Sequence, residues 1–249
     1  MIISIINHKG GTGKTTSSVN ISACLADLGY KVLLVDLDSQ ANSSQALISD
    51  KDYTILNAIK DKKIDTNQLF HYNDKLSLLS ASLDLHILEK ELSDIVIARE
   101  KIFLNLFKPI QDSFDFIILD NPPSLSYIAL NSIVCSEKVL IPLEAEFFSQ
   151  KGLDNLILFF DEAKKGYDLK SEILGIFFTK YSDNTRLSEH FSTMINDDYK
   201  DLLLSSKIRK NVKLGEAHLN GQTILDYSNT SSGAVDYKQL TNEILGILN

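Results

Sequence analysis

The fold of this chain follows from the stretch Lys9-Gly10-Gly11-Thr12-Gly13-Lys14-Thr15-Thr16. It comes shortly after an apolar run at residues 2–6 and leads into a helical pattern. Its glycines allow a tight turn with inward-pointing main-chain N–H groups, and the positive end of the following helix faces the same hollow. A chain of phosphates fits there, with Lys14 at the outer phosphates and the Thr15 hydroxyl on Mg²⁺. The stretch predicts a nucleotide-binding phosphate loop between a strand and a helix.

The loop departs from the general phosphate-loop pattern, because the opening glycine is absent and a second lysine, Lys9, precedes the glycines. Lys14 is sufficient for a nucleotide bound in its own subunit. Lys9 lies at the entrance of the loop, where its side chain could reach a phosphate presented from outside. The alternative is that Lys9 is a solvated surface lysine.

The composition allows a substantial core, because 44% of the 249 residues are hydrophobic. This length suits one large α/β domain or two small ones. No run of about eighteen apolar residues predicts a membrane-spanning helix, and His8 and Lys9 interrupt the first apolar run too early for a secretory signal. Cys24 and Cys135 lie far apart and in no metal-ligand spacing, which is typical of free thiols in a reducing cytoplasm.

The order of the first apolar runs indicates a parallel sheet covered by helices. Residues 2–7 are predicted as a buried strand, residues 14–28 as a helix that stops at Gly29, and residues 31–36 as a second strand. Strand, helix and strand form one βαβ unit, and the phosphate loop lies at its first turn.

The rest of the chain adds further strands to this unit. Apolar runs predict strands at residues 114–120, 137–143 and 173–180. Between residues 43 and 110 the pattern predicts helices on the outer layer, with a possible strand at residues 75–79.

Carboxylates stand where two of these strands end. Asp36 and Asp38 follow the second strand, and Asp120 closes the apolar run at residues 116–119, ahead of Asn121-Pro122-Pro123. Ligands bind at the carboxyl ends of parallel strands, so an acid beside the phosphate loop can hold Mg²⁺ through water. We therefore interpret Asp120 as a Walker B acid. Asp36 and Asp38 could belong to the same site or be turn formers.

The net charge of −8, taken alone, argues against a nucleic-acid binder, which needs a basic surface. One local stretch has the opposite sign: from Tyr199 to Leu214 there are five basic residues and one acid, a local balance of +4. The basic residues are Lys200, Lys207, Arg209, Lys210 and Lys213. This stretch could be an ordinary solvated face or a surface for DNA without sequence preference, since no base-reading helix is evident.

Three separated motifs together resemble the ParA/MinD family of dimerising ATPases. The loop with two lysines resembles the deviant Walker A loop of that family, residues 36–42 (D-x-D-x-Q-x-N) its second acidic motif, and residues 208–217 its C-terminal signature. The resemblance extends from Ile2 to Ile247 and is to short ParA/Soj-type DNA-partition ATPases, which lack an N-terminal DNA-binding domain. It implies an α/β P-loop NTPase in a single domain over residues 1–249, with a doubly wound, mostly parallel sheet and helices on both faces.

The resemblance also implies roles for individual residues. In the family the extra lysine, here Lys9, crosses a nucleotide-sandwich dimer to the partner's ATP. The second aspartate, here Asp38, positions the attacking water, and Asp36 belongs to the neighbouring Mg²⁺ shell. The implied catalytic set is Lys9, Lys14 and Asp38. The implied ATP-binding set is Lys9, Gly10, Gly11, Thr12, Gly13, Lys14, Thr15, Thr16, Asp120 and Asn211. The implied Mg²⁺ set is Thr15, Asp36 and Asp120, and the DNA-binding set is Lys207, Arg209, Lys210 and Lys213.

The sequence departs from the family pattern at several positions. Ser39 and Arg209 each replace a usual proline, His218 stands where another proline is usual, and Asn121 replaces a small residue. The proline that Arg209 replaces helps to frame the base in the family. The packing of the base is therefore left open by the sequence.

Two further segments are candidates for the site by resemblance. Glu146 could lie near the dimer face or be an ordinary acid at a helix N-terminus. Thr179 and Lys180 end a predicted strand, and the loop after this strand lies near the base in related ATPases.

By resemblance, the chain binds ATP and Mg²⁺, forms an ATP-dependent homodimer and binds DNA non-specifically. It releases DNA after a ParB-type centromere-binding protein stimulates hydrolysis, and it is expected in the cytoplasm on the nucleoid. A MinD-type membrane-cycling ATPase is the alternative, but it needs a basic amphipathic C-terminal helix, and residues 237–249 hold one Lys and one Glu. A nitrogenase-iron-protein-like redox ATPase needs thiolates near the dimer axis, where Cys24 is badly placed.

Overall fold

The computed structural model describes residues 1–48, 52–94, 98–145, 149–182 and 186–248. Within these residues one seven-stranded sheet has the strand order β3-β4-β2-β5-β1-β6-β7. The strands are β1 (Ile2–Ile5), β2 (Val32–Asp36), β3 (Phe70–His71), β4 (Leu76–Leu79), β5 (Phe116–Asp120), β6 (Lys138–Glu144) and β7 (Glu172–Thr179). The short β3 pairs antiparallel with β4, and the other neighbouring strands pair in parallel. The predicted mostly parallel α/β sheet is confirmed.

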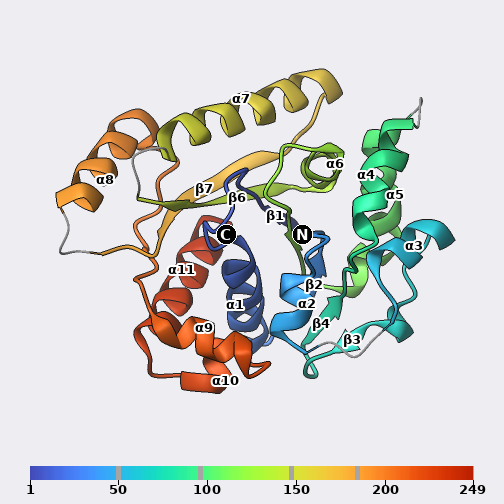
Figure 1. Ribbon diagram of the computed structural model, residues 1–249, viewed down its shortest axis with the longest axis horizontal. Helices are drawn as coiled ribbons and strands as arrows, with labels where there is room; N and C mark the ends of the chain where they lie inside the picture. The colour runs from blue at the N-terminus through green and yellow to red at the C-terminus, as the bar shows by residue number, and fades with distance from the viewer. Residues whose placement is uncertain (49–51, 95–97, 146–148, 183–185, 249) are drawn as a thin grey trace.

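Helices cover both faces of this sheet (Figure 1). The longer helices are α1 (Lys14–Asp27), α4 (Leu85–Asp94), α6 (Tyr127–Cys135), α7 (Ser149–Tyr167), α8 (Arg186–Tyr199), α9 (Val212–Leu219) and α11 (Ser232–Leu248). The shorter ones are α2 (Asn42–Ala46), α3 (Ile55–Asp61), α5 (Ile102–Phe107) and α10 (Ile224–Ser228). Short 3₁₀ helices lie at η1 (Thr66–Gln68), η2 (Arg99–Lys101) and η3 (Lys108–Ser113). In Figure 1, α7 and α8 lie on one side of the sheet, and α1 and α11 lie on the other.

The first strand explains why its sequence is apolar on both faces. Ile3 and Ile5 pack in the cluster that contains side chains of α1 and α11, whereas Ile2 packs in the cluster on the opposite face. A strand buried on both faces needs apolar residues in succession, and each large apolar side chain removed from water contributes about 1.5–3 kcal/mol. The same pattern holds in β2 and β5, so the predicted run of central strands is confirmed.

The strand order places the phosphate loop where the chain changes direction across the sheet. From β1 the chain passes through α1 to β2 on one side, and from β5 it passes through α6 to β6 on the other. Ligands bind at such switch points, beyond the carboxyl ends of the strands. Asp120 ends β5 beside Ile5 of β1 and beside Asp36 of β2. The acids and the loop therefore share one edge of the sheet.

The predictions for the less informative middle of the chain hold in part. The possible strand at residues 75–79 is confirmed as β4, and α3, α4 and α5 provide the predicted outer helices. The antiparallel edge strand β3 was not predicted, because two residues carry no readable periodicity. The first helix ends before Gly29, whose φ of 94° matches the predicted stop.

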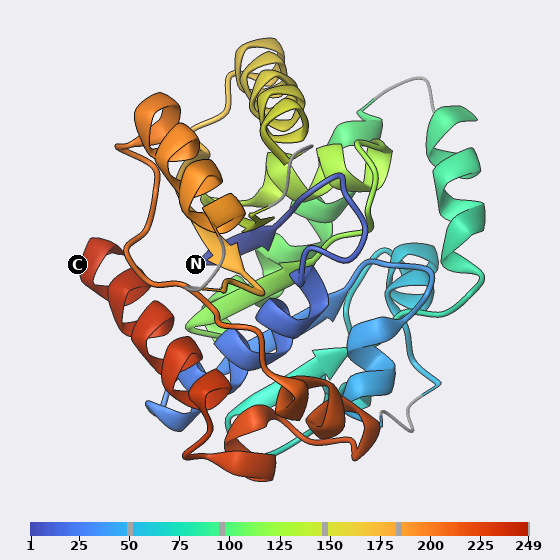
Figure 2. The same ribbon diagram turned by 60° about the vertical axis from the view of Figure 1, so that its left-hand side comes forward.

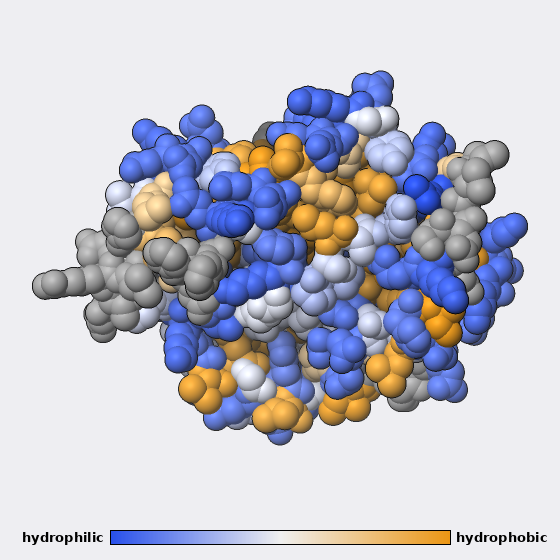
Figure 3. All heavy atoms as spheres, turned by 45° about the horizontal axis from the view of Figure 1, so that its top comes forward, coloured by the Kyte–Doolittle hydropathy of each residue, from blue (hydrophilic) through white to orange (hydrophobic). Residues whose placement is uncertain are grey.

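The last helix packs into the body of the protein. Figure 2 shows α11 alongside α1, and Tyr237, Leu240 and Ile244 of α11 are buried there. None of the helices in the described ranges is long and apolar enough to cross a membrane. On the face drawn in Figure 3, hydrophilic side chains surround the apolar ones. Cys24 and Cys135 are buried free thiols, and burial raises the pKa of Cys24 to about 12, which disfavours a thiolate ligand.

Candidate active site

The phosphate loop between β1 and α1 is held by the end of β7. Gly11 and Gly13 have φ of 77° and 81°, a region that favours glycine. A Cβ on Gly13 would lie 3.4 Å from Cγ2 of Thr179, and the Thr179 hydroxyl donates to the Thr12 carbonyl oxygen at 2.8 Å. Thr179, predicted near the base, thus packs against the phosphate loop and holds its main chain.

The two lysines of the loop are in contact through one main-chain oxygen. The ammonium of Lys14 donates to the carbonyl oxygen of Lys9 at 3.0 Å, and the Thr12 hydroxyl donates to the same oxygen at 3.4 Å. Lys14 is buried, and this burial lowers its pKa although Asp120 and Asp38 oppose the shift. The Lys14 ammonium would bind phosphate oxygens more strongly than the neutral Lys9 carbonyl, because hydrogen bonds that involve ionised groups are about twice as strong as those between neutral groups.

Asp120 is surrounded by hydroxyl groups at the end of β5. It is fully buried and accepts hydrogen bonds from Ser18 at 3.1 Å and from Ser43 at 2.6 Å. Burial raises the pKa of Asp120, and the hydroxyls of Ser43, Thr15 and Ser18 partly offset that effect. Carboxylate and hydroxyl oxygens suit Mg²⁺, which accepts only oxygen-rich, octahedral surroundings. The residues at Thr15 and Asp120 therefore fit the predicted metal.

The other two acids occupy different layers of the same edge. Asp36 is fully buried and accepts from Ser44 N–H at 2.9 Å, from the Ser44 hydroxyl at 2.8 Å and from Asp38 N–H at 3.1 Å. Burial and the neighbouring Asp120 raise the pKa of Asp36. Asp38 accepts from Gln40 N–H at 3.0 Å and lines the cavity, whereas Asp36 lies behind the cavity wall. Asp38 is thus nearer than Asp36 to the place of a bound nucleotide.

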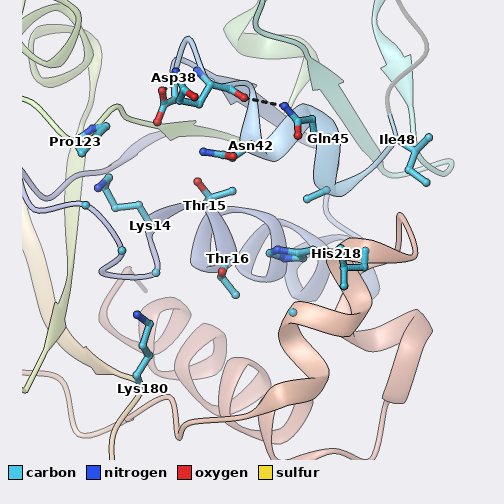
Figure 4. Close-up of a pocket in the computed structure, with 17 residues that line it drawn as sticks. Lys14, Thr15, Thr16, Asp38, Asn42, Gln45, Ile48, Pro123, Lys180 and His218 are labelled. Carbon is cyan, nitrogen blue, oxygen red and sulfur yellow. Dashed lines mark hydrogen bonds between the residues drawn. The ribbon is translucent and has the colours of Figure 1, made fainter.

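A cavity of about 670 Å³ is lined by Lys14, Thr15 and Asp38, whereas Asp36 and Asp120 do not line it (Figure 4). Lys14, Thr15 and Asp38 converge at one end, with Pro123 beside them, and Lys180 enters from another side. The far end is walled by α2 and α9, where His218 points across Thr16. This volume lies in the range of small-molecule sites, and the phosphate loop forms its floor.

The structure places six of the ten predicted ATP-binding residues on the cavity wall, whereas Lys9, Thr12, Asp120 and Asn211 do not line it. The cavity lining includes Gly10, Gly11, Gly13, Lys14, Thr15, Thr16 and Asp38. Asn211 instead caps α9: its side chain accepts from Lys213 N–H at 2.8 Å and donates to the Ser232 hydroxyl at 2.7 Å. Glu146 lies outside the described residues.

The net positive charge of the predicted basic patch is smaller in the structure than the residue count suggests, because Arg209 pairs with an acid of α11. Its guanidinium donates to Asp236 at 2.6 Å and 3.1 Å, and its main-chain N–H donates to the same carboxylate at 2.9 Å. A proline in this place would lack that N–H group. Lys207 lies 4.0 Å from the centroid of the Tyr181 ring, and the Lys213 ammonium donates to the Ser228 hydroxyl at 3.0 Å.

Sequence reasoning missed two supports of the site. Asn121 donates through Nδ2 to the Ser4 hydroxyl at 2.8 Å and to the Ile5 carbonyl at 3.1 Å, which ties β5 to β1 at the start of the loop. A polar amide in place of a small residue after the Walker B acid was the available signal. His218 on the cavity wall was visible only as a departure from a family pattern.

Comparison with known proteins places this geometry in a family. A family model described as an AAA domain matches residues 1–173. Chromosome-partitioning ATPase Soj from Treponema pallidum is 35% identical over 242 residues, which cover 96% of this chain and 95% of that protein. The chain belongs to the Soj/ParA family. Chromosome-partitioning ATPase Soj from Thermus thermophilus is 32% identical, over 98% of this chain and 94% of that one.

A solved structure agrees with the Soj/ParA fold over nearly the full chain. Cobyrinic acid a,c-diamide synthase from Mycobacterium smegmatis, with bound ATP analogue and magnesium, has a TM-score of 0.84 and 25% identity. The match covers 98% of this chain and 93% of that one. Membership of the family makes this chain a P-loop enzyme that hydrolyses nucleotide, of the partition-ATPase type.

Proposed function

We propose that this chain is a Mg²⁺-dependent partition ATPase that pairs and binds DNA in its ATP state. The observation that carries the proposal is that Lys14 and Asp38 line one cavity at the edge of the sheet, where the Lys14 ammonium also donates to the Lys9 carbonyl oxygen. We further propose that residues 1–249 act as one ATPase domain in the cytoplasm, associated with the nucleoid.

Binding of ATP would first exchange the partner of Lys14. The ammonium leaves the Lys9 carbonyl for the outer phosphates, and the loop N–H groups surround the inner ones. Mg²⁺ would be held by Thr15 and by Asp120, whose hydroxyl-rich surroundings suit an oxygen-ligated cation. Asp36, behind the cavity wall, would act on this metal through its neighbours. The metal supplies charge neutralisation between the phosphates.

Hydrolysis would depend on water placed by Asp38. This carboxylate lines the cavity and is oriented by the Gln40 N–H group. Lys14, Lys9 and Mg²⁺ would stabilise the charge that develops on the transferred phosphoryl group. A lone carboxylate is a poor base for water, so intrinsic turnover should be slow, and a ParB-type partner would accelerate it.

Pairing would report the presence of the terminal phosphate. In the ATP state the ammonium of Lys9 reaches the nucleotide of a second copy, so the dimer is stable only while the γ-phosphate is present. This is a shift of population between two association states, driven by their different affinities for ATP.

DNA binding would use the lysines of the basic patch. Lys207, Lys210 and Lys213 have no acidic partner among the described residues, whereas Arg209 is neutralised by Asp236. A dimer doubles the patch, and each phosphate contact contributes about −0.9 to the slope of log affinity against log salt. The burial of α11 against α1 supports DNA rather than a membrane as the bound surface.

The proposal is tested by co-sedimentation of the chain with random-sequence DNA at low salt. We expect retention with ATP and Mg²⁺, and release with ADP or without nucleotide. Anionic vesicles in place of DNA are the control for the membrane-cycling alternative. Equal retention on DNA in all three nucleotide conditions, or ATP-dependent retention on vesicles alone, would contradict the proposal.

A further inference from the structure

His8, the residue before Lys9, lies against the first turn of α7. A Cβ built on Gly152 would be 2.4 Å from Cε1 and 3.1 Å from Nε2 of the His8 ring. The distance of 2.4 Å is shorter than real Cβ contacts, so the imidazole occupies the space that a side chain at position 152 would fill. The His8 ring, at the entrance of the phosphate loop, therefore packs directly against the main chain of α7 at Gly152, and we call this contact the seat of His8.

The seat of His8 carries a cost that packing alone does not explain. Its Nδ1 atom is buried and has no hydrogen-bond partner among the residues that the structure describes. A buried polar atom left without a partner costs about 1–3 kcal/mol. Burial, with Lys14 and Lys9 nearby, lowers the pKa of His8 and so favours the neutral ring. An orphaned polar atom in a native structure suggests a role other than stability.

The position of Lys9 depends on the residues on its N-terminal side. Asn7 donates to the Pro142 carbonyl oxygen of β6 at 2.7 Å and accepts from Lys9 N–H at 3.0 Å. His8 adds a second support, from α7. Together, Asn7 and His8 fix the main chain at Lys9, whose carbonyl also holds Lys14.

The helix that supports His8 is itself anchored. Gln150 donates to Asp198 of α8 at 2.6 Å, and the Tyr199 hydroxyl of α8 donates to Asp154. These contacts lie on either side of Gly152 in the sequence of α7. The first turn of α7 is therefore a fixed surface, against which a ring can define the place of the loop.

We propose that His8 is a positioning residue: by resting on Gly152, it holds Lys9 where its ammonium can reach the nucleotide of a second copy. This inference rests on the proposed ATP-dependent pairing and names a residue that sets its geometry. Loss of the seat should weaken pairing while sparing the binding of ATP to one subunit, because Lys14 exchanges the Lys9 carbonyl for phosphate oxygens when ATP binds and the glycines are unchanged.

The test compares two glycines of the same helix. Gly152→Ala places a methyl group inside the His8 ring, whereas Gly166→Ala meets no atom within 4 Å. Pairing is measured by sedimentation equilibrium with AMPPNP and Mg²⁺, and ATP affinity by titration calorimetry. We expect Gly152→Ala to weaken pairing by about tenfold with ATP affinity changed by less than about threefold, and Gly166→Ala to match the wild type.

Two further variants separate the seat from a general fold defect. In His8→Ala the methyl group of Gly152→Ala should be accommodated, so the double variant should pair no worse than His8→Ala alone. His8→Gln, which keeps a planar polar head, should pair better than His8→Ala. Additive effects of the two substitutions, or a Gly152→Ala chain that pairs normally, would overturn the inference and leave the proposed function standing. A wild-type chain that stays monomeric with AMPPNP would overturn both.

Discussion

Arg209→Ala tests the ion pair between Arg209 of the basic patch and Asp236 of α11, which we call the clamp. Asp236 is 3% exposed, so its carboxylate is solvated by protein groups rather than by water. Arg209 supplies it with a short Nη2 contact at 2.6 Å, an Nε contact at 3.1 Å and the main-chain N–H at 2.9 Å. The substitution removes the hydrogen bonds from Nη2 and Nε and leaves the one from the main-chain N–H.

The expected loss of stability lies between two limits. Removal of one partner from a fully buried ion pair costs about 3–5 kcal/mol, and the loss of an exposed pair costs about 0.2–1 kcal/mol. The Arg209 side chain is 47% exposed while its partner is buried. We therefore expect Arg209→Ala to lower the free energy of unfolding by about 2 kcal/mol, which corresponds to a fall in Tm of roughly 4–8 °C for a chain of this length.

The reverse substitution should cost less. Asp236→Ala leaves Arg209, which can turn to water, so we expect a loss of about 1 kcal/mol or less. Both variants and the double variant are measured by urea unfolding at neutral pH. Because Asp236 already neutralises Arg209, Arg209→Ala should also weaken DNA binding less than Lys210→Ala does. Equal costs for the two single variants, or strictly additive ones, would refute the clamp.

Three further outcomes follow from the site. Lys14→Ala should abolish nucleotide binding in calorimetry, since the ammonium that replaces its Lys9 contact with phosphate is lost, and retained ATP affinity would count against the loop assignment. Burial raises the pKa of Asp36 and of Asp120 above the ordinary aspartate value of 3.8. At pH values above 3.8 and without nucleotide, the folded chain therefore binds more protons than the unfolded chain. The free energy of unfolding should therefore fall as pH rises from about 4 toward neutrality, by up to about 1.4 kcal/mol per pH unit for each group, and Asp36→Asn should make this fall shallower; identical slopes would exclude the effect. The double variant Lys210→Glu and Lys213→Glu should reduce DNA retention with ATP and leave pairing intact. Unchanged retention would place the DNA surface elsewhere.

The phosphate loop, the strand that ends at Asp120 and the position of the acids could be predicted from short stretches of sequence. The glycines predicted the loop, and the apolar run before Asp120 predicted a buried strand. Asp36 and Asp120 each end a strand, and they lie together because the carboxyl ends of parallel strands meet at one edge of the sheet. The helix stop at Gly29 was equally local, since a positive φ favours glycine.

Contacts between distant segments were beyond the sequence. Nothing near Arg209 announces Asp236, and nothing near His8 announces Gly152, because each pair is created only by the packing of α11 and α7. Asn211 was predicted by resemblance to bind the nucleotide, and that role stays a prediction; the structure shows its side chain capping α9, which the sequence reasoning did not foresee. Capping is a common use of asparagine and competes with any binding role.

The central claim is that the terminal phosphate of ATP decides whether two copies associate. The most direct measurement is the solution mass, by light scattering, of an Asp38→Ala chain with Mg²⁺ and saturating ATP or ADP. The account predicts twice the mass of one chain with ATP and the mass of one chain with ADP. The same mass in both nucleotides would contradict it.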